Sequence, residues 1–308
     1  MGEIVNVLVT GITGYLGSVL APALVHNGHA VRGFARHPER TAIEVPIIQG
    51  DAITGAGLAA ALEGIEVAYY LIHSMEPSIG GPFSSRERVA AERFAQAAVA
   101  ARVRRIVYLG GLLPQAGARS DHLSSRLDVE EILLAARPES VALRASIVIG
   151  AGSRSFRFLV RLVERLPIVA VPSWQVNRTQ PIDERDMVAL LVAAASTDAA
   201  AGQSLDIGGP DVVTYRQLIE RIRDLMLIGR PTVGFRRLAV TPIASRVAAL
   251  IAGEDHELVG PLMESLATDL LPSDDRAATL LGVRRHSLDA AIEHSLAEWE
   301  RREPLAAR

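Results

Sequence analysis

Three glycines near the start of the chain are spaced so that they could bind a phosphate group. They follow the apolar run Val5 to Val9, and an apolar helical pattern runs from Ser18 to His26 after them. This order predicts a strand, a tight turn and a helix, the context in which a glycine-rich turn binds a dinucleotide. The first glycine permits the turn, the second lets a diphosphate approach the backbone, and the third lets the helix pack closely. The helix N-terminus adds unpaired N–H groups and the positive end of the dipole.

We assign the whole turn to this site: Gly11, Thr13, Gly14, Tyr15, Leu16 and Gly17. The alternative is a sharp strand–helix turn that binds nothing.

Two arginines follow the second expected strand, residues 29–35. Arg36 stands where an acidic residue would hold the ribose 2′-hydroxyl of NAD, and Arg40 lies one helical turn further along. A guanidinium suits a 2′-phosphate, to which it can donate two charge-assisted hydrogen bonds. We therefore expect NADPH (NADP) to be preferred over NAD. The alternative is that both arginines are solvated side chains of a loop.

The composition excludes several kinds of chemistry. The 308 residues contain no cysteine, and all 32 basic residues are arginine, so the chain has no lysine. Disulfides, thiolates, Schiff bases and any Tyr-x-x-x-Lys pair are therefore excluded. The eight histidines are scattered, and we expect no metal site. With 32 basic and 35 acidic residues and a net charge of −3, we expect no nucleic-acid partner. We expect a cytoplasmic protein, because the sequence has no signal-peptide pattern and no integral membrane segment.

Further strands alternate with helical patterns along most of the chain. Expected strands cover residues 45–51, 67–72, 105–111, 140–150 and 203–210, with helices at 85–101, from Ser120, at 155–166 and from Asp186 to Ala195. The fold class is therefore α/β: a Rossmann-type, doubly wound parallel sheet with a smaller, mostly helical C-terminal lobe. We place the dinucleotide-binding domain at residues 1–208 and the lobe at 209–308, with residues 151–182 contributing to the pocket.

Six short segments carry a resemblance to a known family. They are Thr-Gly-x-x-Gly-x-x-Gly at 10–17, Gly-Asp at 50–51, Tyr-Leu-Ile-His-Ser-Met at 70–75, Tyr-Leu-Gly-Gly-Leu at 108–112, His-Leu-x-Ser-Arg at 122–126 and Asp-Ile-Gly-Gly-Pro-Asp at 206–211. On these motifs the chain resembles an atypical short-chain dehydrogenase/reductase. It is similar to the bacterial NAD(P)H-binding group related to NmrA-like proteins and to the NADPH-binding subunit of respiratory complex I. The resemblance covers roughly residues 4–270.

The resemblance implies further cofactor contacts at the carboxyl ends of the strands. Asp51 and Ala52 would lie beside the adenine. Alternatively, Asp51 caps the helix expected near residues 55–57, and the two roles are compatible. Leu71, His73 and Ser74 would lie beneath the ribose or nicotinamide. The backbone near Ala145 would meet the carboxamide. The remaining implied contacts are Gly110, Ser146 and Ile147.

The expected catalytic pair departs from the family pattern. Where relatives carry Tyr-x-x-x-Lys, this chain has His122 and Arg126, which share one face of a helix. The helix dipole and the arginine favour a neutral imidazole, which can donate a hydrogen bond to a developing oxyanion. We assign His122 as this donor and Arg126 as its electrostatic support. Alternatively, both residues are structural or bind only the nicotinamide ribose.

The resemblance leaves two classes of function. The first is an NADPH-dependent oxidoreductase that reduces a quinone, an enone or a similar small organic acceptor. The second is a non-catalytic NADPH-binding redox sensor or assembly protein. For the first, we expect the acceptor pocket to be lined by Met75, Leu112, Phe156, Trp174 and Met187. We expect a monomer or a homodimer.

Overall fold

A seven-stranded parallel sheet organises the protein. The computed structural model describes residues 4–72, 83–115, 121–165, 169–171, 173–229, 232–234 and 268–303. The strand order is β11-β6-β5-β4-β1-β2-β3, and every neighbouring pair is parallel. The strands are β1 (Asn6–Thr10), β2 (Ala30–Ala35), β3 (Ile47–Gln49), β4 (Val67–Tyr70), β5 (Arg105–Gly111), β6 (Val141–Ala145) and β11 (Ser204–Ile207). Because β1 and β4 are neighbours, the chain reverses its direction of winding between them, as the doubly wound prediction requires.

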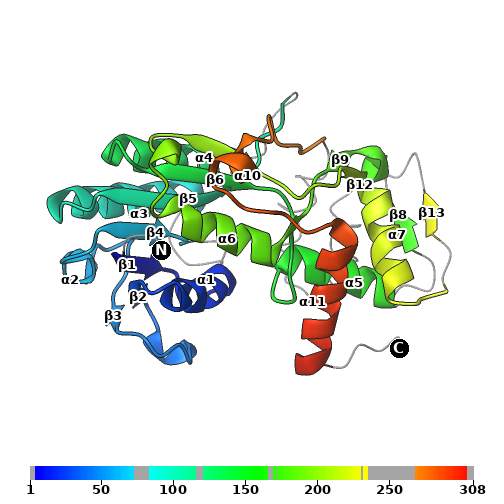
Figure 1. The fold of residues 1–308 in the computed structure, drawn as a ribbon, viewed down its shortest axis with the longest axis horizontal. Coiled ribbons are helices and arrows are strands. Elements are labelled where there is room, and N and C mark those ends of the chain that lie inside the picture. Colours follow the sequence, from blue (N-terminus) through cyan, green and yellow to red (C-terminus); the bar gives the residue numbers. More distant parts are fainter. Residues whose placement is uncertain are drawn as a thin grey trace.

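Helices cover both faces of this sheet (Figure 1). One face carries α1 (Tyr15–His26), α6 (Glu184–Ala194) and the short α10 (Arg276–Leu280); the other carries α2 (Leu58–Leu62), α3 (Phe83–Ala100) and α4 (Asp121–Ala136). Side chains alternate between the two cores along each strand. Tyr69 is buried on the α6 side, and its neighbour Tyr70 is buried on the α3 side. The expected α/β class is confirmed.

A second core lies at one end of the sheet. Helices α5 (Arg154–Arg165), α7 (Tyr215–Leu225) and α11 (Leu288–Arg302) pack together there, as Figure 1 shows. Trp174 on the 3₁₀ helix η2 (Ser173–Val176) belongs to this core, whereas Ala277 on α10 returns to the core of the sheet. The chain therefore crosses between the two cores more than once.

Short strand pairs connect the two parts. They are β7 (Val148–Ile149) with β10 (Ile182–Asp183), β9 (Arg178–Thr179) with β12 (Val213–Thr214), and β8 (Val169–Val171) with β13 (Thr232–Gly234). Two further 3₁₀ turns, η1 (Pro38–Arg40) and η3 (Asp198–Ala200), lie in connections. Among the residues that the structure describes, no helix is both long and apolar enough to span a bilayer.

Several expected boundaries were wrong, and two of them lie close to the candidate site. The strand expected at 140–150 ends at Ala145, because the chain changes partners: Ile182 N donates to the carbonyl of Ile147, and β7 joins β10. Helix α6 begins at Glu184 instead of Asp186, because Asp183 caps it by accepting a hydrogen bond from Arg185 N.

The capping role that the sequence allowed for Asp51 was also wrong, because Asp51 does not cap α2. Its carboxylate accepts from Ile53 N at 2.7 Å, and α2 begins only after Gly57, whose backbone is left-handed with φ of 78°. An Asx-type turn has therefore replaced the expected cap.

Candidate active site

The glycine-rich turn has the close packing that its spacing predicts. Gly11 has φ of 65°, and a Cβ there would lie 2.9 Å from the carbonyl oxygen of Leu71. A Cβ on Gly17 would lie 2.5 Å from both the Gly11 carbonyl oxygen and the Ile12 Cα. Gly14 differs, because its only near neighbour is the Gly11 oxygen at 3.2 Å. Gly11 and Gly17 are thus required by packing, whereas the absence of a side chain on Gly14 keeps space open in front of the turn.

The first turn of α1 is arranged to bind an anion. Gly14 is the N-cap residue, no side chain caps the helix, and no acidic residue stands in its first turn. The turn itself is fixed by hydrogen bonds from Gly14 N to the Gly11 carbonyl and from Ser18 N to the Gly14 carbonyl, both 2.9 Å. The leading N–H groups of a helix without a capping side chain, together with the positive end of its dipole, favour a phosphate ligand. The residues present therefore fit a dinucleotide diphosphate.

Thr10 fixes the point where the winding of the sheet reverses. Its buried hydroxyl donates to the Tyr69 carbonyl at 2.9 Å and accepts from Leu71 N at 3.1 Å. The side chain thereby joins the ends of β1 and β4, where ligands bind in open parallel sheets. The motif Thr-Gly had signalled a turn, but not this bridging role.

The other predicted cofactor residues stand at the same edge of the sheet. Leu71 follows β4, Gly110 is near the end of β5, and Ala145 ends β6. Gly111 lies directly beside Ala145, and Leu112 N donates to the Ala145 carbonyl at 3.1 Å. Asp51 and Ala52 follow β3, and Ser146 and Ile147 follow β6. The structure therefore gathers the described members of the set at one edge, while His73 and Ser74 lie outside the described residues.

Tyr15 uses its side chain differently from a cofactor ligand. Its phenol donates a hydrogen bond to Glu184, the first residue of α6. The backbone of Tyr15, the first helical residue of α1, stays part of the turn, as do Thr13 and Leu16. The Tyr15 hydroxyl is therefore engaged within the protein, and the contact of Tyr15 with a dinucleotide stays a prediction.

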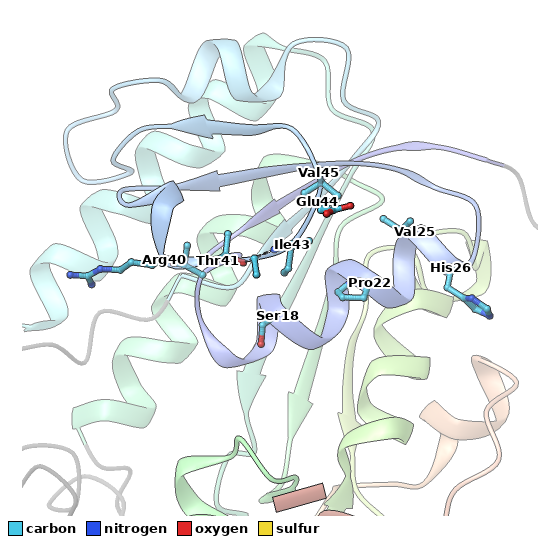
Figure 2. Close-up of a pocket in the computed structure, with 11 residues that line it drawn as sticks. Ser18, Pro22, Val25, His26, Arg40, Thr41, Ile43, Glu44 and Val45 are labelled. Carbon is cyan, nitrogen blue, oxygen red and sulfur yellow. Dashed lines mark hydrogen bonds between the residues drawn. The ribbon is translucent and has the colours of Figure 1, made fainter. Parts of the chain in front are cut away.

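Arg36 and Arg40 flank the end of β2 as predicted. Both are exposed, and Arg40 ends η1. An open groove of about 780 Å³ runs along α1 beside this loop, and Figure 2 shows Arg40 and His26 at its opposite ends. Thr13 and Ser18 also line the groove, so it adjoins the glycine-rich turn. Two exposed cations thus follow β2, and their contact with a ribose 2′-phosphate stays a prediction.

Arg126 is held inside the protein. Its guanidinium donates to the Leu109 carbonyl at 2.8 Å, lies 3.6 Å from the Glu87 carboxylate and packs over the ring of Tyr108. Only 9% of the arginine side chain and 4% of the glutamate side chain are exposed. The charge of Arg126 is therefore balanced by a buried carboxylate, and the guanidinium ties α4 to β5 and α3 instead of facing open space. His122 belongs to α4, but its side chain lies outside what the structure describes.

The predicted acceptor residues are mostly packing residues in this structure. Phe156 and Trp174 are buried in the core of the small lobe, and Met187 is buried between α6 and the sheet. Leu112 is buried after β5, and Met75 lies outside the described residues. These positions give the four described side chains a role in packing, and contact with an acceptor stays a prediction.

Two site residues escaped the sequence reasoning. Glu87 on α3 pairs with Arg126 and also accepts from Ser125 Oγ at 2.7 Å, and Glu184 binds Tyr15. No short-range signal marks either glutamate, because each partner is tens of residues away along the chain. Only the packing of helices onto the sheet brings them together.

Comparison with known proteins also indicates that the chain binds a nicotinamide dinucleotide. Residues 11–147 match a family described as NAD(P)H-binding. The ceramide reductase of Caulobacter vibrioides is 27% identical over 276 residues, covering 87% of this chain and 86% of that protein. A (4-alkanoyl-5-oxo-2,5-dihydrofuran-3-yl)methyl phosphate reductase of Streptomyces griseus is 28% identical over 255 residues, covering 79% and 80%. Subunit 9 of the NADH dehydrogenase [ubiquinone] 1 alpha subcomplex from Arabidopsis thaliana mitochondria is 25% identical over 288 residues, covering 87% and 71%.

Solved structures share the fold. A short-chain dehydrogenase/reductase superfamily protein from Agrobacterium tumefaciens, with NAD bound, has a TM-score of 0.69 and 20% identity, covering 96% of this chain and 97% of that one. The UDP-glucose 4-epimerase of Thermotoga maritima has a TM-score of 0.74 and 14% identity, covering 96% and 99%. Together with the parallel sheet and the glycine-rich turn, these findings make residues 11–147 an NAD(P)H-binding domain, and the whole chain is similar in fold to proteins of the short-chain dehydrogenase/reductase type.

Proposed function

We propose that this chain is an NADPH-dependent reductase of a small organic acceptor. The observation that carries the proposal is the glycine-rich turn at Gly11–Gly17. This turn begins a helix that has no capping side chain, and it lies at the edge of the sheet where the parallel strands end. When bound there, the reduced nicotinamide supplies a hydride. The residues of the chain bind and orient the cofactor through the turn and through the backbone after β6.

The preference for NADPH rests on Arg36 and Arg40. Both guanidinium groups stand after β2, and no acidic residue takes the place that would select NAD. An Arg36→Asp variant should lose roughly tenfold to hundredfold in NADPH affinity and gain affinity for NADH, because a charge-assisted contact is replaced by repulsion. Fluorescence titration with both cofactors measures this. Arg102→Asp is the matched control, since Arg102 is exposed and precedes β5 at the opposite edge of the sheet. Equal affinities of the unmutated protein for the two cofactors would contradict the assignment.

The acceptor should need little acid catalysis. A chain without lysine cannot form the phenol–ammonium pair that protonates a carbonyl in related enzymes. Three relatives are named as reductases of a ceramide, an alkanoyl-dihydrofuran phosphate and a 2-alkyl-3-oxoalkanoate, all of which carry alkyl or acyl chains. These names support an acceptor that carries an apolar chain, and the missing phenol–ammonium pair favours an enone or a quinone as its reducible group. His122 would be the hydrogen-bond donor to this group.

Oxidation of NADPH against a panel of quinones, enones and alkyl ketones tests this proposal. We expect turnover with at least one class, and we expect a His122→Ala variant to bind NADPH normally while losing most of that turnover. Tight NADPH binding without oxidation by any acceptor would favour the non-catalytic alternative. Failure to bind either dinucleotide would overturn the proposal as a whole.

A further inference from the structure

A hydrogen bond between two side chains joins the glycine-rich turn to helix α6. The phenol of Tyr15 donates a hydrogen bond to the carboxylate of Glu184. This hydrogen bond links the first residue of α1 to the first residue of α6. Because Tyr15 is the first helical residue after the N-cap Gly14, this contact acts on the backbone that a diphosphate would meet.

Two glycines in the segment between β7 and α5 leave room for the Tyr15 and Glu184 side chains. A Cβ on Gly150 would collide with both the Tyr15 hydroxyl and the Glu184 carboxylate. A Cβ on Gly152 would lie 2.5 Å from the Tyr15 ring. The turn between β7 and α5 is thus shaped around the pair, which shows that the contact is built into three elements of the fold.

The surroundings of Glu184 are rich in negative charge. Asp183 lies next to it on the chain, and Glu298 on α11 faces it; Arg302, which pairs with Glu298, offsets part of this charge. Burial raises the pKa of the Glu184 carboxyl, the hydrogen bond from Tyr15 lowers it in part, and the neighbouring carboxylates raise it further. Burial also raises the pKa of Tyr15, so the phenol keeps its proton and remains the donor.

We propose that Tyr15 and Glu184 are positioning residues of the dinucleotide site, and that Glu184 takes up a proton from solvent when the dinucleotide binds. The inference rests on the proposed dinucleotide binding. A diphosphate at the N-terminus of α1 adds negative charge near a carboxylate that is already half-buried among like charges. Binding therefore favours the protonated carboxyl, which still accepts the Tyr15 hydrogen bond through its carbonyl oxygen.

The sign of the effect follows from linkage. The pKa of Glu184 is raised in the free protein and is raised further in the complex. Between these two values the complex binds more protons than the free protein, so NADPH affinity strengthens as pH falls through this window. Above the window, both states are ionised and the affinity no longer changes from this cause.

The experiment is calorimetric titration of the full chain with NADPH at several pH values, in two buffers of different ionisation enthalpy, which counts the protons taken up. The 2′-phosphate of NADPH titrates as well, but its contribution cancels between variants. Glu184→Gln keeps an acceptor for the Tyr15 phenol and removes the titration. We expect it to lose proton uptake while binding NADPH at pH 8 at least as tightly as the unmutated protein.

Two further variants separate positioning from simple folding. Glu184→Ala removes the acceptor and should weaken NADPH binding by about fivefold, the value of one lost hydrogen bond, and Gln at the same position should restore it. Tyr15→Phe removes the contact that lowers the pKa of Glu184, so the uptake should move to higher pH. Glu92→Gln, an exposed change on α3, is the control and should match the unmutated protein.

Each of these measurements has a result that would overturn the inference. Unchanged proton uptake in Glu184→Gln, or an unmoved uptake window in Tyr15→Phe, would overturn the inference while leaving NADPH binding in place. If Glu184→Gln does not fold, the Tyr15→Phe window alone carries the test. Absence of NADPH binding in the unmutated protein would overturn the proposed function and this inference with it.

Discussion

Adding one methyl group to the glycine-rich turn should weaken NADPH binding at both Gly14 and Gly17, but should destabilise the fold only at Gly17. At Gly17 a Cβ would meet the backbone of Gly11 and Ile12 at 2.5 Å, whereas an ordinary contact begins at 3.4 Å. The start of α1 would have to move by roughly 0.9 Å, and backbone atoms on the other side cannot yield. At Gly14 the nearest atom would be 3.2 Å away, and its φ of −86° suits alanine.

The expected magnitudes follow from these contacts. Overpacking costs about 1–3 kcal/mol, and the 2.5 Å approach to backbone atoms puts Gly17 in the upper part of this range, at about 2–3 kcal/mol, of which the better helix propensity of alanine offsets about 1 kcal/mol. Gly17→Ala should therefore lower the free energy of unfolding by about 1–2 kcal/mol and also weaken NADPH binding. Gly14→Ala should change the free energy of unfolding by less than about 0.5 kcal/mol, yet weaken NADPH binding at least tenfold, because the new methyl group occupies the space left for the diphosphate.

Urea denaturation and NADPH titration of both variants measure the two effects separately. Gly229→Ala is the control, because nothing lies within 4 Å of its Cβ and it should leave both quantities unchanged. Unaltered NADPH affinity in Gly14→Ala would refute the reasoning, since it would mean that no diphosphate approaches the turn. A Gly17→Ala variant as stable as the unmutated protein would show that α1 can move away freely.

Two further predictions concern charged pairs. Arg126→Met should lower the free energy of unfolding by about 3–5 kcal/mol, because it removes the guanidinium that lies 3.6 Å from the buried Glu87 carboxylate. Urea denaturation measures this, and an effect below about 1 kcal/mol would argue against a buried pair. The second concerns Asp269, whose pKa is lowered by the hydrogen bonds from the backbone and guanidinium of Arg178. A carboxyl whose pKa is lower in the folded than in the unfolded state stabilises the protein above its unfolded pKa, and this stabilisation is lost as the pH falls further. The free energy of unfolding of Asp269→Asn should therefore depend less on pH below about 4 than that of the unmutated protein. Parallel curves of unfolding free energy against pH for the two proteins would contradict this prediction.

The sequence was enough to predict the sheet, because its strands are buried on both faces. Such strands read as short apolar runs, and β5 was predicted with its observed bounds, Arg105–Gly111. Errors arose where one apolar run serves two sheets. The run from 140 to 150 gave no signal that Ser146 N turns toward Ile207 while β7 pairs with β10. That change depends on partners that are distant in sequence.

The candidate site was predictable in its backbone and not in its charge balance. Glycine spacing reports local sterics, so the close contacts of Gly11 and Gly17 could be anticipated. The i, i+4 spacing correctly placed His122 and Arg126 on one helix, but it could not show that Arg126 faces a glutamate from α3. A buried ion pair is set by the packing of two helices, and single-sequence periodicity does not report it.

The tyrosines of the chain bear on how an acceptor would receive its proton. Burial raises the pKa of every one of them: Tyr15, Tyr69, Tyr70, Tyr108 and Tyr215. The phenols of Tyr15, Tyr69 and Tyr108 donate to protein oxygens, and the pKa of Tyr108 is about 12. A phenol that works beside a nicotinamide needs the opposite shift, toward neutral pH, which a lysine ammonium normally provides. Because no tyrosine here has such a shift, the proton must come from another group or from water. Acceptors such as quinones and enones fit this site best, because their reduced products are stabilised without full protonation in the hydride step.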